Sequence, residues 1–157
     1  MISQTAEYAL RAVVFLAQHS DRSFPSREIA TATKVPPGYM SKVLQQLARA
    51  DIVKSQRGVR GGFALARSPR DLTMLDVLAA TDTPVRRITK CPLELSKHVK
   101  LCALHQRLDD AMAYIERLFG GTSIAQFIDE SDGIVPLCAD KSELVEVSVS
   151  HAPHQMP

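Results

Sequence analysis

The 157-residue sequence contains no tryptophan, and aromatic residues make up only 5% of it. A carbohydrate-binding or aromatic-stacking pocket is therefore not expected. No apolar run approaches the roughly 18 residues that a membrane-spanning helix requires. The N-terminal residues also lack the basic and apolar regions of a secretory signal. We therefore expect a cytoplasmic protein with no membrane partner.

Cysteine is scarce, with three residues at positions 91, 102 and 138. A small, odd number of cysteines does not build a disulfide framework. In a reducing compartment these residues are expected to be buried thiols, metal ligands or redox sensors. Hydrophobic residues make up 45% of the chain, which is enough for a globular core. The length fits one domain, or one domain with an appendage.

Acidic residues are scarce in the first half of the chain. Residues 1–70 contain 11 Lys and Arg but only 4 Asp and Glu, whereas residues 71–157 contain 8 and 13, so the halves carry charges of +7 and −5. A basic half joined to an acidic half suggests a module that binds a polyanion, followed by a second unit. Scattered surface charge is the alternative.

Apolar residues at helical spacing predict three helices in the basic half. The first covers about residues 6–17, the second begins near Ser26 as its cap, and the third covers residues 37–50. The third helix carries apolar residues at i, i+3, i+4 and i+7 from Met40. Its opposite face is rich in hydrogen-bond donors and has no acidic residue: Tyr39, Ser41, Lys42, Gln45, Gln46 and Arg49.

A β-hairpin is predicted next, with strands at residues 52–56 and 63–66. The connection Arg57-Gly58-Val59-Arg60-Gly61-Gly62 contains three glycines, which permit the positive φ angles of a hairpin tip. Arg57 and Arg60 are the only charges at this tip. A phosphate-binding loop is the alternative, but no Gly-Lys-Ser/Thr motif is present and a strand, not a helix, follows.

The acidic half is predicted to be helical as well. A short helix begins at Thr73 with a capping box, and a long amphipathic helix runs from about residue 101 to 119. Gly120-Gly121 ends the long helix, and Ser123 can cap a last short helix. Residues from 131 onward are polar and contain prolines, so we expect a flexible tail.

This order of elements is that of a winged helix-turn-helix. We therefore predict a mainly α fold with a small β-wing, together with a long helix that serves as the dimer seam. An amphipathic helix of this length needs a partner face. The predicted units are a DNA-binding domain at residues 1–80 (wing 52–66), a sensor loop and dimerisation helix at 81–130, and the tail at 131–157.

The donor-rich helix and the hairpin are the expected DNA-binding elements, and Ser26 lies at the start of the helix before them. Four basic residues would contact phosphates or a narrow minor groove: Lys42, Arg49, Arg57 and Arg60. Four others would lie at base edges: Tyr39, Ser41, Gln45 and Gln46. A two-fold dimer implies a near-palindromic operator in double-stranded DNA. A protein-interaction adaptor with the same fold is the alternative, against which the donor-rich face and the arginine wing argue.

Several segments together resemble the bacterial winged-helix transcription regulators of the IscR/NsrR family. They are Glu7-Tyr8-Ala9-Leu10, Ile29-Ala30, Tyr39-Met40 and the run Arg57–Ala66. The resemblance covers about residues 1–120. It implies a homodimeric transcription regulator, which we expect to be a repressor that senses redox state, nitric oxide or iron–sulfur status. Asp51 stands where the family commonly has glycine, but aspartate tolerates the left-handed conformation better than most residues.

The resemblance also implies a set of cluster ligands. Family members that bind a cluster commonly carry three cysteines between the wing and the long helix, whereas this chain has only Cys91 and Cys102 there. His105 matches the Cys-x-x-His spacing of IscR, and Glu7 falls where related proteins supply a carboxylate from the partner subunit. We therefore expect a 2Fe–2S cluster, with zinc or a metal-free thiol–disulfide switch as alternatives. Taken one at a time, each candidate ligand also fits a structural role without metal. Glu7, for example, can form an ion pair with Arg11 one helical turn later.

A cysteine-dependent enzyme is the remaining alternative, with Cys91 or Cys102 as nucleophile and His105 or His98 as base. The sequence offers neither a third orienting group nor an oxyanion site for such a reaction. We therefore do not expect an enzyme, and we assign no role to Cys138.

Overall fold

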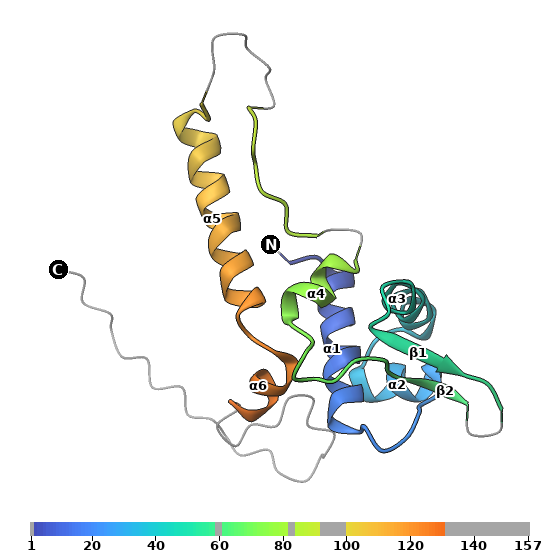
Figure 1. Cartoon of the computed structure of the whole chain (residues 1–157). Helices are drawn as coiled ribbons and strands as arrows, with labels where there is room; N and C mark the ends of the chain where they lie inside the picture. Colours follow the sequence, from blue (N-terminus) through green and yellow to red (C-terminus); the bar gives the residue numbers. More distant parts are fainter. Residues whose placement is uncertain (1, 59–60, 82–83, 92–99, 131–157) are drawn as a thin grey trace, which may run out of the picture.

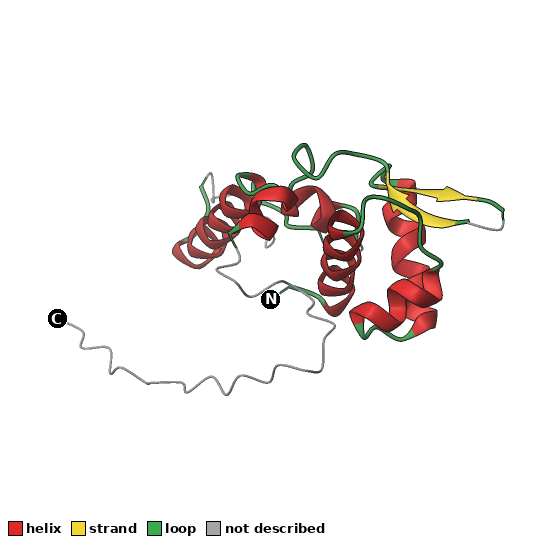
Figure 2. Cartoon of the chain, turned by 90° about the horizontal axis from the view of Figure 1, so that it is seen from below, coloured by secondary structure: helices red, strands yellow, loops and turns green. Residues whose placement is uncertain are grey.

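The computed structural model describes residues 2–58, 61–81, 84–91 and 100–130 (Figure 1). The fold is mainly helical with one two-stranded antiparallel sheet, which confirms the predicted class (Figure 2). The elements in chain order are α1 (Gln4–Gln18), α2 (Ser26–Thr33), α3 (Pro37–Arg49), β1 (Val53–Gln56), β2 (Gly62–Leu65), α4 (Met74–Ala79), α5 (Ala103–Gly120) and α6 (Ile124–Asp129).

Helix α1 is the centre of the N-terminal body. It contacts α2, α3, α4, α6 and β2, and Figure 1 shows α2 and α3 on one side of it with α4 and α6 on the other. Its buried face includes Val13 and Leu16. Helix α3 buries the predicted apolar stripe against this core, with Met40, Val43, Leu44 and Leu47 all at most 1% exposed. Burial of this stripe leaves the polar face of α3 outward.

The starts of the helices follow local rules, with one correction. Thr73 and Ser123 form the capping boxes that open α4 and α6, as predicted. The prediction that Ser26 caps α2 is wrong, because Pro25 is the N-cap and no side chain bonds to the helix start. Proline holds φ near −65°, and Pro25 has φ −57° and ψ 144°, so its backbone alone positions the entry to the helix.

Two left-handed residues terminate the helix-turn-helix elements. Lys34 and Asp51 both have φ of 54°, at the ends of α2 and α3 respectively. The conformation of Asp51 confirms the prediction that aspartate sustains this turn in place of glycine. At Lys34 the backbone N–H donates to Thr31 O at 3.3 Å, which closes α2 before the turn into α3.

The wing is a short hairpin anchored at its base. Strand β1 pairs with β2 in a register that sets Val53 opposite Leu65 and Gln56 opposite Gly62. Phe24, in the loop between α1 and α2, pairs with β2 through an isolated antiparallel bridge. Its N–H donates to Phe63 O at 2.9 Å, and Phe63 N–H donates to Phe24 O at 2.8 Å. Strands β1 and β2 extend beyond the helices in both views (Figures 1 and 2).

Helix α5 stands apart from this body and packs mainly against α4 (Figure 1). It begins at Ala103, after an extended Cys102. Helix α6 returns to α1, and its residue Ile124 is fully buried in the N-terminal core. The division of the chain at residues 80 and 130 stays a prediction, and the predicted tail lies outside the described residues. No helix in the described part of the chain is long and apolar enough to cross a membrane.

Candidate DNA-binding surface and cysteine site

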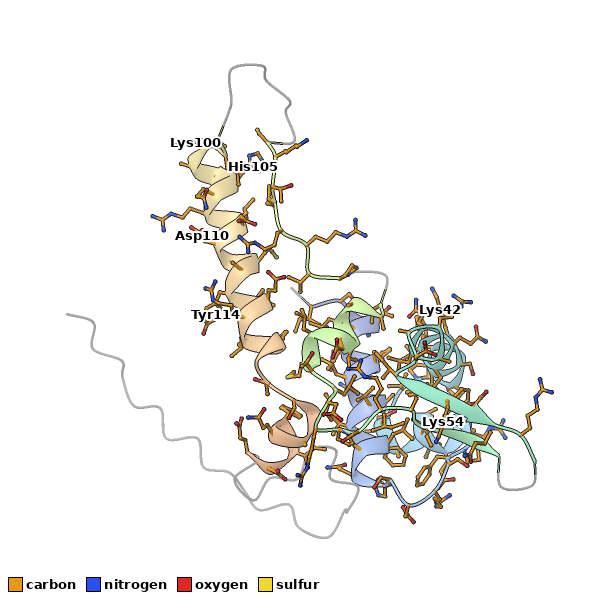
Figure 3. All side chains as sticks on the ribbon, in the orientation of Figure 1. Lys42, Lys54, Lys100, His105, Asp110 and Tyr114 are labelled. Carbon is orange, nitrogen blue, oxygen red and sulfur yellow. The ribbon has the colours of Figure 1, made fainter. Side chains whose placement is uncertain are left out.

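The outer face of α3 carries the side chains that the sequence assigned to DNA. Tyr39 is 54% exposed, and Gln46 is half-buried. The remaining predicted contacts on this helix are exposed: Ser41, Lys42, Gln45 and Arg49. Lys42 is labelled on this outer face in Figure 3. Ser26 is half-buried at the start of α2. The helix therefore presents a contiguous donor-rich surface on the side of the molecule away from α5.

The wing supplies two further cations. Arg57 is exposed at the end of β1, and Lys54 is exposed on the same strand (Figure 3). Lys54 was not predicted, although its place next to buried Val53 on a strand would have indicated an outward side chain. Arg60 lies outside the described residues. Gly58 adopts φ of 113°, the positive φ expected at the hairpin tip.

Helix α1 contacts the start of the recognition helix α3. The Tyr8 and Tyr39 rings meet edge to face, with centroids 6.2 Å apart. Arg11 lies 5.8 Å from the centre of the Tyr8 ring and donates to Thr33 O at 3.2 Å. The same Arg11 forms an ion pair with Glu7. Tyr8 belongs to the motif Glu7-Tyr8-Ala9-Leu10 that carries the family resemblance, but its contact with Tyr39 was not predicted from the sequence.

Cys91, Cys102 and His105 come together at the start of α5 (Figure 3 labels His105). Cys102 Sγ lies 3.2 Å and Cys91 Sγ 3.8 Å from the same atom, His105 Nδ1. Both cysteines are free thiols; Cys91 is buried and Cys102 is half-buried. Two sulfur donors and one nitrogen donor suit iron–sulfur clusters and zinc. The set is one ligand short of four.

Glu7 does not join this group within one subunit. Its side chain is 54% exposed near the start of α1, which Figure 1 places well away from the start of α5. Within one subunit, Glu7 instead forms an ion pair with Arg11 on the same helix. Within the described residues, no three or more His, Cys, Asp and Glu side chains are arranged to hold a metal ion. This includes Cys91, Cys102 and His105 as they stand, so a bound metal would require these side chains to rearrange and further ligands to join them. His98 and Cys138 lie outside the described residues.

A buried carboxylate holds the linker before Cys91 against α5. Asp109 is 6% exposed and accepts two hydrogen bonds from Arg87, at 2.7 and 2.6 Å, and one from Ile88 N–H at 2.8 Å. Arg87 also lies 3.5 Å from Glu116. The hydrogen bonds from Arg87, reinforced by the Ile88 N–H, lower the pKa of Asp109 to about 2. The sequence does not predict this contact, because no local pattern connects residues that lie 22 positions apart.

The low pKa of Asp109 predicts a pH dependence of stability. An aspartate in an unfolded chain has a pKa of about 3.9, so the native state is stabilised above that pH and the stabilisation is lost as the pH falls through about 2. We expect the difference in Tm between the parent protein and Asp109→Asn to be largest near neutral pH and to shrink below about pH 4. Thermal unfolding from pH 6 down to pH 2.5 measures this. For Asp110→Asn, on the exposed side of α5, no such convergence is expected, and a pH-independent difference for Asp109→Asn would contradict the assignment.

Comparison with known proteins identifies the family of this chain. The family model for Rrf2, described as an iron-dependent transcriptional regulator, matches residues 2–130. A protein of Aquifex aeolicus named as an HTH-type transcriptional regulator is 31% identical over 133 residues, covering 82% of this chain and 92% of its own.

Solved structures support the fold. The structure of CymR, the global cysteine regulator of B. subtilis, superposes with a TM-score of 0.71 at 20% identity, covering 84% of this chain and 98% of that one. IscR of T. potens superposes with a TM-score of 0.69 at 24% identity, covering 84% and 88%. The family and these relatives are regulators and not enzymes, as predicted from the sequence. The chain belongs to the Rrf2 family of winged-helix transcriptional regulators.

Proposed function

We propose that this protein is a homodimeric repressor whose affinity for a near-palindromic operator responds to a 2Fe–2S cluster. Cys91, Cys102 and His105 would hold the cluster together with Glu7 of the partner subunit. The observation that carries the proposal is the convergence of both thiols on one nitrogen, His105 Nδ1. As a DNA-binding protein it would act in the cytoplasm. Absorbance and iron content of the parent, Cys91→Ala and Cys102→Ala proteins, purified without oxygen, test this assignment.

The residues of this chain suggest how the sensor would act on DNA. When bound, the cluster would supply one-electron redox chemistry at a potential raised by its nitrogen and oxygen ligands. Ligation by Glu7 would draw on the carboxylate that pairs with Arg11 and would therefore weaken or redirect that ion pair. Arg11 contacts Tyr8 and Thr33 O, and the Tyr8 ring contacts Tyr39 at the start of α3. Ligation by Glu7 would therefore alter the contacts that position the recognition helix.

The donor-rich face of α3 and the wing are the proposed DNA interface, and Arg57 tests the wing. Replacing Arg57 with alanine removes an exposed cation, so operator affinity should fall for all sequences. The slope of log affinity against log salt should flatten by about one unit if one phosphate contact is lost. Fluorescence anisotropy over a salt series measures both quantities. Arg107→Ala removes the same charge from exposed α5 and should leave the slope unchanged; equal slopes for the two variants would remove the wing from the interface.

The dimer seam is proposed to be the exposed apolar stripe of α5. Leu104, Leu108 and Leu118 are 65%, 43% and 49% exposed and share one side of the helix with Ala111. Exposed leucines at this spacing are typical of a helix that packs on another copy. A second copy of this chain would cover the stripe, because binding to a near-palindromic operator requires a two-fold symmetric dimer.

Leu108→Asp tests this seam. A carboxylate in a dry interface has no partner and costs several kcal/mol, so we expect a folded monomer or an unfolded chain. Light scattering combined with circular dichroism separates these outcomes from a dimer. Gln106→Glu adds the same charge to the opposite, polar side of α5 and should remain a dimer. A folded dimer of Leu108→Asp would place the interface elsewhere.

A further inference from the structure

We propose that the Arg87–Asp109 pair is the positioning device of the sensor: it holds Cys91 within reach of Cys102 and His105. This inference deepens the proposed function and rests on it for its biological meaning. Whether the Arg87–Asp109 pair fixes the position of the Cys91 thiol can be tested without any cluster. Neither residue is a ligand, and both act through the backbone between them and the ligands.

The linker before Cys91 has no secondary structure of its own. Residues 84–91 form neither helix nor strand, so side-chain contacts decide where this segment lies. Figure 1 shows it running beside α5 towards the start of that helix. Among the described residues, polar contacts join the linker to α5 at only two places: Arg87 with Ile88, and Cys91.

An open groove lies beside the start of the linker. It has a volume of about 540 Å³ and is lined by Pro84, Val85 and Arg86 of the linker and by Met112, Ile115 and Phe119 of α5. An open groove holds the linker less firmly than close-packed side chains do. The Arg87–Asp109 ion pair, together with the Ile88 N–H bond, is a strong polar constraint on the path of the linker.

The two contacts lie on one face of α5. His105 and Asp109 are one helical turn apart, about 6 Å along the axis at 1.5 Å per residue. Only three residues lie between Arg87 and Cys91, so fixing Arg87 limits how far the thiol can move. Asp109 accepts hydrogen bonds from both the Arg87 side chain and the Ile88 backbone, which fixes the direction of the linker as well as its position.

The experiment uses the full-length, metal-free protein with Cys138→Ser in every variant, so that Cys91 and Cys102 are the only thiols. The fluorescent cross-linker dibromobimane reports whether the two sulfurs lie close together. Cobalt(II) titration, followed by thiolate-to-cobalt absorption, reports whether they can ligate one metal. In Asp109→Ala we expect both the cross-linking rate and the cobalt affinity to fall about tenfold, the scale of loss for residues that orient ligands.

The control variant is Asp110→Ala, which removes the neighbouring carboxylate on the exposed side of α5 and should leave both readouts within twofold of the parent. Asp109→Asn keeps one acceptor oxygen and should recover part of the loss. Arg87→Ala should lose less than Asp109→Ala, because Ile88 N–H still donates to Asp109, and the double variant should lose no more than Asp109→Ala alone. Arg87 is 44% exposed, so its removal gives a second variant if Asp109→Ala fails to fold.

The results separate this inference from the proposed function. Unchanged cross-linking and cobalt affinity in a folded Asp109→Ala or Arg87→Ala protein would overturn the inference, even if the parent protein binds a cluster. Additive losses in the double variant would also overturn it, because they indicate two independent contacts. A tenfold loss of both readouts would support it, even if the parent protein never forms a chromophore with iron and sulfide.

Discussion

Replacing Gly62 with alanine is expected to detach the wing from the helical body and to lower the free energy of unfolding by roughly 3 kcal/mol. A Cβ at this position would lie 2.3 Å from the carbonyl carbon of Phe24 and 2.4 Å from its oxygen. That oxygen accepts the hydrogen bond from Phe63, so relief of the clash breaks the bridge at the base of the wing. The φ of 156° at Gly62 is also rarely adopted by other residues.

Thermal unfolding measures this effect, and a loss of this size corresponds to a fall in Tm of about 6–12 °C for a domain of this length. Gly38→Ala is the matched control. A Cβ at Gly38 meets no atom within 4 Å, and the residue lies in the first turn of α3, so alanine should leave stability unchanged or raise it by up to about 1 kcal/mol. If Gly62→Ala and Gly38→Ala have the same Tm, the contact between Phe24 and Gly62 does not hold the wing.

Replacing Cys91 or Cys102 with alanine is expected to abolish the iron–sulfur chromophore of the protein purified without oxygen. These are the two sulfur donors of the site, and each lies within 3.8 Å of His105 Nδ1. Loss of either leaves one thiolate, which does not hold an iron–sulfur cluster. Absorbance and iron content per subunit measure the effect. A chromophore that survives both substitutions would rule out these ligands.

Glu7→Ala is expected to destabilise the same chromophore across the dimer, so a mixed dimer should keep one of its two sites. Glu28→Ala is the matched control, because Glu28 forms a comparable exposed pair with Arg22 and lies on α2. Equal effects of the two substitutions would show that Glu7 only stabilises its own helix through Arg11.

The alternatives have distinct outcomes in the same experiments. Colourless protein that fails to take up iron and sulfide but binds one zinc per site would replace the cluster with zinc. Protein without any metal would leave a Cys91–Cys102 disulfide as the switch. In that case an oxidant should change operator affinity in the parent protein and not in a Cys91→Ser variant.

Much of the fold could be predicted from the sequence because its signals are local. The spacing of apolar residues from Met40 to Leu47 determines which face of α3 is buried, and period alone reveals it. The caps at Thr73 and Ser123, and the left-handed Asp51, depend on residues within one turn of each other. The hairpin follows from the three glycines that connect two short strands. The cysteine-histidine site was found only by likeness to a family, since its members are separated along the chain.

The sequence by itself therefore determined the elements, their order and the outward face of the recognition helix. Only the tertiary structure decided which distant side chains meet. Arg87 reaches Asp109, Phe24 pairs with Phe63, and Tyr8 touches Tyr39. Such contacts depend on how helices and loops are packed in space, and neither periodicity nor capping encodes that packing. Glu7 shows the same limit: within one subunit, only the fold reveals that it lies far from the cysteines whose ligand set it was predicted to complete.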